Sequence, residues 1–142
     1  MNKIIKFTEV NPINISDLNQ IKKEISKTIN NGDFILGNSV MNFEKKFSKI
    51  SKVRHAVGCG SGTDALILAL MSLELKNDDE VIVPGITYIS TGLSVILNKN
   101  KLVLADKNNE TGLIFLDKIK KKITKKTKAI IPVHFTGYMT DM

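Results

Sequence analysis

Apolar residues recur along this chain with two spacings, and each spacing predicts a different kind of element. In the first third they fall three or four residues apart, which is typical of one face of a helix. Ser16 is expected to cap the first helix, and Asn38 or Ser39 the second. The first stripe comprises Leu18, Ile21, Ile25 and Ile29, on one face of the helix; the second, whose two aromatic residues are predicted to be core, comprises Val40, Phe43, Phe47 and Ile50. Residues 4–10 are expected to form an extended lead-in, and residues 30–33 a turn followed by an apolar loop at 34–37.

In the remainder, short continuous apolar runs alternate with helical stretches. We predict strands at 54–59, 80–83, 102–106 and 128–133, helices at 63–75, 87–97 and 116–123, and a loop at 134–142. Short apolar strands alternating with helices predict a three-layer α/β fold with a mainly parallel sheet covered on both faces. The chain is expected to be one domain or part of one, residues 1–142, with a helical lead-in over about residues 1–52 and an α/β part over about residues 53–142.

Three glycines lie between a predicted strand and a predicted helix, in the stretch VGCGSGTDAL at residues 57–66. Gly58, Gly60 and Gly62 allow an anion to approach the backbone closely, and the first N–H groups of a helix have no partner inside it. Thr63 adds a hydroxyl donor. The stretch therefore predicts a phosphate-binding loop, with an ordinary tight turn as the alternative. Ligands of parallel sheets bind outside the carboxyl ends of the strands, where residues 84–88, Asp106 and residues 134–137 are also expected.

Charge and composition change this picture little. The 142 residues are 42% hydrophobic and carry a net charge of +7, with the lysines densest in KIKKKITKKTK at residues 118–128. That run could bind nucleic acid or anionic lipid. We favour the solvated face of a helix anchored by Leu116, Ile119 and Ile123, because no aromatic residues are interleaved for base stacking. The single Cys59 excludes an internal disulfide and is expected to be a small buried residue. No metal cluster, secretory leader or membrane-spanning stretch is readable, so we expect a cytoplasmic protein without nucleic-acid or membrane partners.

Three chemistries could use the glycine loop. A dinucleotide-binding fingerprint would need a third glycine where Thr63 stands, and a methyltransferase that binds S-adenosylmethionine would usually carry an acidic residue in place of Ala56. The third rests on five collinear blocks. From Asn31 onward the sequence resembles the DegT/DnrJ/StrS family of pyridoxal-phosphate-dependent sugar aminotransferases. The matching blocks are GDFILG at 32–37, FEKKFSKI at 43–50, HAVGCGSGTDAL at 55–66, DDEVIVPGITYIST at 78–91 and TKAIIPVHFTGYMTDM at 127–142.

The resemblance implies the first part of the large domain of a fold-type-I, aspartate aminotransferase-like enzyme. It implies pyridoxal 5'-phosphate as cofactor, a nucleotide-linked sugar with a keto group as substrate, glutamate as amino donor, and a homodimer. By the same resemblance, Ser61, Gly62 and Thr63 bind the cofactor phosphate and Tyr88 lies against the pyridine ring. Asp64 and His134 are expected to be structural, and the loop at 34–37 to border the sugar pocket.

Two groups that this chemistry needs are not matched. They are the lysine that forms a Schiff base with the cofactor and the aspartate that pairs with the pyridine nitrogen. In the family both follow the segment that matches residues 134–142. No catalytic residue is therefore assigned here, and we expect an amino-terminal fragment, from a partial record, a split gene or a retained noncatalytic piece. Such a fragment should be inactive and unstable alone. A methyltransferase and a noncatalytic binding module stay open as alternatives.

Overall fold

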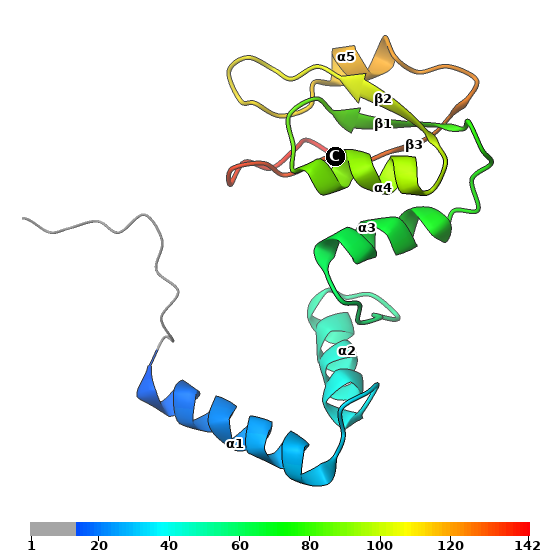
Figure 1. Ribbon diagram of the computed structural model, residues 1–142. Coiled ribbons are helices and arrows are strands. Elements are labelled where there is room, and N and C mark those ends of the chain that lie inside the picture. Colours follow the sequence, from blue (N-terminus) through cyan, green and yellow to red (C-terminus); the bar gives the residue numbers. More distant parts are fainter. Residues whose placement is uncertain (1–13) are drawn as a thin grey trace, which may run out of the picture. The chain divides into compact units, whose positions relative to one another are not determined.

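The computed structural model describes residues 14–142, which divide into two compact units (Figure 1). The first unit ends at Gly58 and the second comprises Cys59–Met142. The expected extended segment at residues 4–10 lies outside the described residues. Each unit is built differently: in its described part, residues 14–58, the first has helices and no strand, and the second is an α/β unit.

The first helix of the first unit, α1, spans Ile15–Asn31. Its cap is Asn14 rather than the predicted Ser16: the Asn14 side chain accepts a hydrogen bond from the Asp17 backbone N–H at 2.8 Å. Asparagine and serine cap helices about equally well, so the sequence pattern alone did not separate the two positions. The helix ends as predicted, at Gly32, whose left-handed backbone (φ 64°) permits the usual C-terminal cap.

The second helix, α2, spans Asn38–Ile50 and is capped from a distance. Asp33 accepts a hydrogen bond from the Asn38 N–H at 2.8 Å, so neither Asn38 nor Ser39 is the capping residue. Gly37 makes this contact possible, because a Cβ atom at that position would collide with the Asp33 carboxylate. The glycines and the aspartate of the GDFILG block thus have a local structural reason for being there.

The two predicted apolar stripes form as faces of these helices, but neither face is buried. Neither α1 nor α2 has a buried residue. On α2, the Phe43 and Phe47 rings pack on each other with centroids 5.7 Å apart, yet 59% and 49% of these residues are exposed. The expectation that the α2 stripe is core is therefore wrong among residues 14–142, and the α1 stripe has no buried residue either.

The second unit begins with helix α3, Gly62–Met71, which is shorter than the predicted 63–75. The strand predicted just before it, at 54–59, does not form. A strand is stable only when its backbone groups pair with a neighbour, and this segment has no strand beside it among the described residues. Gly58 instead donates its N–H to Glu44 at 2.7 Å, and Val57 is exposed. Cys59, expected to be buried, is exposed as well.

The sheet has three parallel strands in the order β2-β1-β3 (Figure 1). Strand β1 spans Glu80–Pro84, β2 Lys101–Ala105 and β3 Thr127–Ile130, each within a few residues of its predicted place. Every residue of β1 is buried, which explains why its sequence is continuously apolar from Val81 to Val83. Val81 pairs with Leu102 of β2 and with Ala129 of β3.

Helices cover both faces of the sheet, as the three-layer prediction requires. Helix α4, Ile89–Leu97, packs with α3 on one face, and the short α5, Leu116–Lys120, covers the other (Figure 1). The α3–α4 side of the core contains Leu70, Val81, Val83 and Val95. The α5 side contains Ile82, Ala105, Ile114 and Ile119. Alternate residues of β1 thus contribute to two different core clusters.

The lysine-rich run is less helical than expected. Helix α5 ends at Lys120 rather than at residue 123, and of its three predicted anchors only Ile119 is buried. Leu116 and Ile123 are exposed. The lysines of residues 118–128 lie on the surface of the second unit, so the solvated character of the run holds but the anchoring by three residues does not.

Candidate active site

The predicted phosphate-binding loop leads directly into α3, and Ser61 is the N-cap of that helix. The Asp64 N–H donates to Ser61 Oγ at 3.1 Å, and Ser61 Oγ donates in turn to Asp64 Oδ2 at 2.9 Å. The single hydroxyl proton of Ser61 is therefore held by Asp64. This reciprocal pair explains both residue types: an acidic side chain in the first turn of a helix also interacts favourably with the helix dipole.

The next two residues, Gly62 and Thr63, open the helix with free donors. Neither backbone N–H makes a hydrogen bond within residues 14–142. A Cβ atom at Gly62 would meet nothing within 4 Å, so the space beside it is open. Such a helix start, with unpaired N–H groups and open space, suits an anion. The Asp64 carboxylate lies 3.0 Å from where a Cβ of Gly60 would be, so one negative charge is close to the loop.

Two side-chain hydrogen bonds hold α3 against α4. Thr63 Oγ1 and Ser90 Oγ are 2.6 Å apart near the starts of the two helices, and further along Asn98 donates from Nδ2 to the Ile67 carbonyl at 3.2 Å. The helices therefore run in the same direction, and both begin on the side of the sheet where β1 and β2 end (Figure 1). This edge is where ligands of parallel sheets bind.

Tyr88 stands immediately before α4, at its N-cap position, two residues from Ser90. It follows the end of β1 through Pro84 and Gly85, and the Gly85 N–H donates to the Ala105 carbonyl at 2.8 Å, which fixes the turn to β2. Tyr88 is 74% exposed, so it does not pack on the sheet. The structure thus brings four predicted residues, Ser61, Gly62, Thr63 and Tyr88, to the adjoining starts of α3 and α4.

Other polar residues at the strand ends have local partners. Asp106 follows β2, and its carboxylate accepts the Lys107 N–H at 2.9 Å. His134 follows β3, and its Nδ1 accepts the Thr140 N–H at 2.9 Å, which places the ring proton on Nε2 and agrees with the structural role expected for this histidine. Cys59 donates from Sγ to the Ser61 carbonyl at 3.4 Å. Among residues 14–142, no three His, Cys, Asp or Glu side chains gather as metal ligands.

Ser90 and Asn98 were not predicted as site residues. Both act through contacts with residues about 30 positions away in the sequence, and no local spacing reveals such a pairing. The only signal was the polar first turn of α4, where Ser90 and Thr91 follow Tyr88 within an otherwise apolar stretch.

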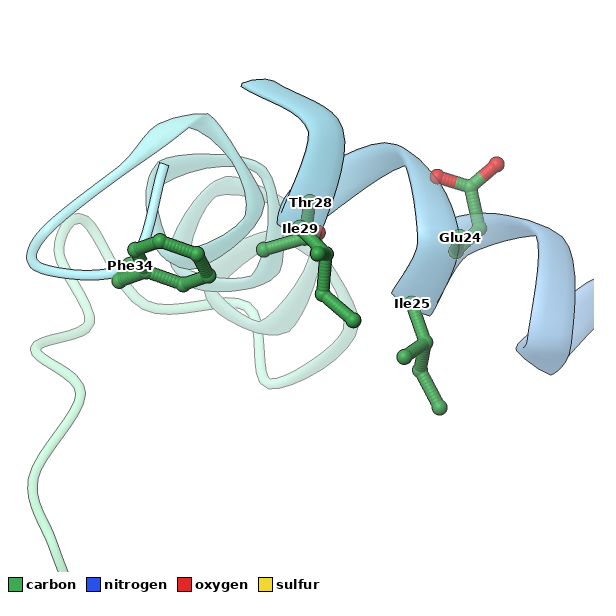
Figure 2. Close-up of a pocket in the computed structure, with 5 residues that line it drawn as sticks. All are labelled: Glu24, Ile25, Thr28, Ile29 and Phe34. Carbon is green, nitrogen blue, oxygen red and sulfur yellow. The ribbon is translucent and has the colours of Figure 1, made fainter. Parts of the chain in front are cut away.

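The first unit has a shallow apolar hollow of about 290 Å³ on the surface of α1 (Figure 2). It is lined by Glu24, Ile25, Thr28, Ile29 and Phe34. Figure 2 shows Ile25 and Ile29 pointing the same way, with the Glu24 carboxylate turned from them. The hollow is thus part of the exposed apolar face of α1. None of the helices among residues 14–142 combines the length and the apolar character needed to cross a lipid bilayer.

The model of the DegT/DnrJ/EryC1/StrS aminotransferase family matches residues 16–142. The chain belongs to this family. The match takes in the loop, both helix starts and all three strands, and it replaces the methyltransferase interpretation of the glycine loop.

Several curated relatives of the chain are enzymes named for nucleotide-linked sugars. A UDP-N-acetyl-3-dehydro-alpha-D-glucosamine 3-aminotransferase of Acidithiobacillus ferrooxidans is 42% identical over 123 residues, which cover 87% of this chain and 33% of the relative. A dTDP-3-amino-3,6-dideoxy-alpha-D-galactopyranose transaminase of Aneurinibacillus thermoaerophilus is 35% identical over 139 residues, covering 98% of this chain and 38% of the relative. The chain therefore spans about a third of the length of the curated relatives it matches.

Solved structures give the same result for the fold. A Bacillus subtilis protein with bound cofactor PMP aligns with a TM-score of 0.87 at 31% identity, covering 99% of this chain and 33% of that one. DesV of S. venezuelae, solved in complex with a ketimine intermediate, aligns with a TM-score of 0.81 at 33% identity, covering 89% and 35%. The chain thus has the fold of part of a fold-type-I aminotransferase, as the sequence predicted.

Proposed function

We propose that these 142 residues are the cofactor-phosphate and ring-stacking part of a pyridoxal-phosphate-dependent aminotransferase that acts on a keto group of a nucleotide-linked sugar. The observation that carries the proposal is the pair of adjoining helix starts, α3 with its free N–H groups and α4 with Tyr88, in a chain that belongs to this family. When bound, pyridoxal phosphate supplies an electron sink for the carbon that gains or loses the amino group.

The start of α3 fits the phosphate end of the cofactor. Gly62 and Thr63 offer two unpaired backbone N–H groups, the Thr63 side chain offers a hydroxyl, and the open space at Gly62 lets an anion come close. Ser61 would take part through its backbone, because its hydroxyl proton is held by Asp64. The Asp64 carboxylate repels the anion, and the helix start with its donors has to outweigh that repulsion.

Tyr88 fits the ring end. Its phenol group is exposed and precedes α4 directly, so a flat ligand whose phosphate lies at α3 can extend toward it. Aromatic faces stack well on a pyridine ring. The proposed roles of Ser61, Gly62, Thr63 and Tyr88 are thus binding and orientation, and none of them is proposed to move a proton on the substrate.

The remaining partners of the reaction are proposed on the family resemblance. Glutamate would donate its amino group to the sugar, whose keto oxygen it replaces, and would leave as 2-oxoglutarate. Relatives are named for UDP-, dTDP- and GDP-linked sugars, which supports a nucleotide-linked substrate as a class. A homodimer is proposed for the intact protein, since the apolar faces of α1 and α2 need cover. Charged, water-soluble reactants support a cytoplasmic location.

The lysine that bonds covalently to the cofactor and the aspartate that pairs with its ring nitrogen are proposed to lie outside residues 1–142. The chain spans about a third of its relatives, which leaves room for both. This proposal gives a sharp test. Pyridoxal phosphate is added to the intact protein, the mixture is reduced with borohydride, and the modified peptide is mapped. We expect one modified lysine per protomer, beyond residue 142.

The same treatment of the 142-residue chain alone is the control, and it should give no single preferred lysine. Stoichiometric modification of one lysine within residues 1–142 would overturn the assignment of these residues as a noncatalytic part. Amino transfer is then assayed with glutamate and keto sugars linked to UDP, dTDP or GDP. Formation of 2-oxoglutarate with none of these sugars would reject the substrate class while leaving the cofactor assignment intact.

A further inference from the structure

Ser90 is a buried polar residue at the candidate site to which no role has yet been assigned. It lies in the first turn of α4 and is only 7% exposed, although it carries a hydroxyl group. Its side chain has one hydrogen-bond partner among residues 14–142, the Thr63 hydroxyl at 2.6 Å. A bond this short between two hydroxyl groups joins the first turn of α4 to the first turn of α3.

Burial decides which of the two hydroxyl groups donates. Each group has a single proton. If Thr63 donated to Ser90, the Ser90 proton would be left buried without an acceptor, which is costlier than losing an ordinary hydrogen bond. If Ser90 donates, both groups are satisfied, because Thr63 is only half-buried and its own proton can turn outward. The buried partner is therefore the donor.

The direction of this bond matters to an anion at the start of α3. A Thr63 hydroxyl that donates to Ser90 would present only lone pairs to a phosphate oxygen and would repel it. A Thr63 hydroxyl that accepts from Ser90 keeps its proton free for the phosphate, and a donor that also accepts is polarised into a better one. We infer that Ser90 is a positioning residue for the cofactor phosphate, since it donates to Thr63 and leaves the Thr63 proton for the anion. This inference rests on the proposed function.

The test compares two ligands that differ only in the phosphate. Pyridoxal phosphate and pyridoxal are titrated into the intact protein, and affinities are measured by absorbance or fluorescence. The Ser90→Ala variant should bind pyridoxal phosphate about 3- to 10-fold more weakly, the range expected for one neutral hydrogen bond, and pyridoxal unchanged. Ser90→Thr keeps the hydroxyl group and should restore the preference for the phosphate form.

A matched control separates positioning from simple packing. Ser94 lies one turn later on α4, is fully buried, and donates to the Thr91 carbonyl at 2.9 Å; among residues 14–142 it has no hydrogen bond to Thr63. Ser94→Ala should therefore leave the ratio of the two affinities unchanged, even if it lowers stability. In a Thr63→Val background, Ser90→Ala should cause no further loss for pyridoxal phosphate, because the two hydroxyl groups act through one contact.

The outcomes separate the inference from the function on which it rests. If the unchanged protein binds both ligands equally, it has no phosphate site and both proposals fail. If it prefers pyridoxal phosphate and Ser90→Ala keeps that preference, only the role of Ser90 is overturned. Two further results would mean that Ser90 serves packing alone. One is that Ser90→Ala lowers the affinities for pyridoxal phosphate and pyridoxal equally. The other is that the affinity losses of Ser90→Ala and Thr63→Val add in the double variant.

Discussion

Ser61 and Thr63 are two residues apart at the start of α3, yet their hydroxyl groups have different surroundings. Ser61 exchanges hydrogen bonds with Asp64 and thereby caps α3. Thr63 faces Ser90 of the neighbouring helix and is half-buried. At this scale the same chemical group serves helix stability at one position and, as we propose, ligand binding at the other.

Replacing the Ser61 side chain should therefore cost stability more than cofactor affinity. Ser61→Ala removes the N-cap of α3 and should destabilise the helix by about 1 kcal/mol, the usual value for a lost cap. Binding of pyridoxal phosphate by the intact protein should fall less than in Thr63→Val, since the Ser61 hydroxyl proton is already held by Asp64. Hydrogen exchange of the α3 amides measures the first effect and ligand titration the second.

Ser61→Asn is the matched control for this prediction, because asparagine caps helices as well as serine does. It should preserve both helix protection and ligand affinity. If Ser61→Ala weakened binding of pyridoxal phosphate as much as Thr63→Val does, the Ser61 hydroxyl group would be a phosphate ligand and its pairing with Asp64 would open when the ligand binds.

At this scale, sequence reasoning selected residues that lie at the two helix starts, but it did not find their pairings. The glycine loop, Thr63 and Tyr88 were singled out from local spacing and family resemblance. The bond between Thr63 and Ser90 joins residues 27 positions apart, and the Asn14 cap was missed because Ser16 fits the same rule. Which of two equivalent capping residues is used, and which hydroxyl groups meet, is decided by tertiary packing.

Among the elements, β1 was the most predictable. A short apolar run between turn residues indicates a strand covered on both faces, and all of β1 is buried. The segment at 54–59 has a similar appearance but forms no strand, because strand formation needs a pairing partner that a local pattern does not contain. In the second unit, the predicted positions of strands and helices therefore agree with the structure where a neighbouring element packs or pairs with them. The predicted ends of the helices are less accurate.

One polar residue ties the three strands together at the start of β1. Glu80 is only 5% exposed and accepts hydrogen bonds from Thr124 at 2.6 Å and from Lys101, with which it forms an ion pair at 3.0 Å. Thr127, at the start of β3, is a weaker donor at 3.4 Å. The Thr124 hydroxyl, followed by the Lys101 ammonium group, holds the pKa of the Glu80 carboxyl below its ordinary value, against the opposing effect of desolvation.

The low pKa of Glu80 predicts how strand stability depends on pH. Because the carboxyl has a lower pKa in the folded protein than the ordinary value of about 4.3, its ionised form stabilises the sheet above that pH. This contribution is lost as the pH falls through the folded-state pKa. Glu80→Gln should therefore lower the protection of β1 amides at pH 7, and the difference from the unchanged protein should shrink as the pH falls below the ordinary carboxyl value of about 4.3.

Glu110→Gln provides the control for that experiment. Glu110 is exposed in the same unit, and its side chain makes no hydrogen bond or ion pair among residues 14–142, so the variant should leave protection unchanged across the same pH range. Hydrogen exchange of the intact protein, corrected for the intrinsic effect of pH, reports both variants. If the effect of Glu80→Gln stayed constant while the pH fell from 7 through the acidic range in which the carboxyl is protonated, the stabilising role of the ionised Glu80 would be contradicted.

At the scale of the whole molecule, residues 14–142 expose much apolar surface. The apolar faces of α1 and α2 contain no buried residue, and exposed large side chains also occur on α3 and α4 and after α5. Within residues 14–142, the outer strands β2 and β3 each have one edge without a paired strand. Surface of this kind is normally buried by further chain or by a partner. The sequence predicted apolar faces correctly, but no pattern within 142 residues identifies what covers them.

The 142-residue chain expressed alone should therefore be marginally stable or aggregation-prone. We expect strong binding of a hydrophobic dye and no sharp transition in calorimetry, because the first unit has no buried core residue on either helix. Hydrogen exchange should be slowest in β1, which is buried on both faces, and fastest in α1 and α2. Replacing Ile25 and Ile29 with glutamine should reduce dye binding without lowering helix content, which would trace the exposed surface to α1. A soluble monomer that unfolds sharply and cooperatively would contradict this picture, because it would mean that the apolar faces find cover within the chain itself.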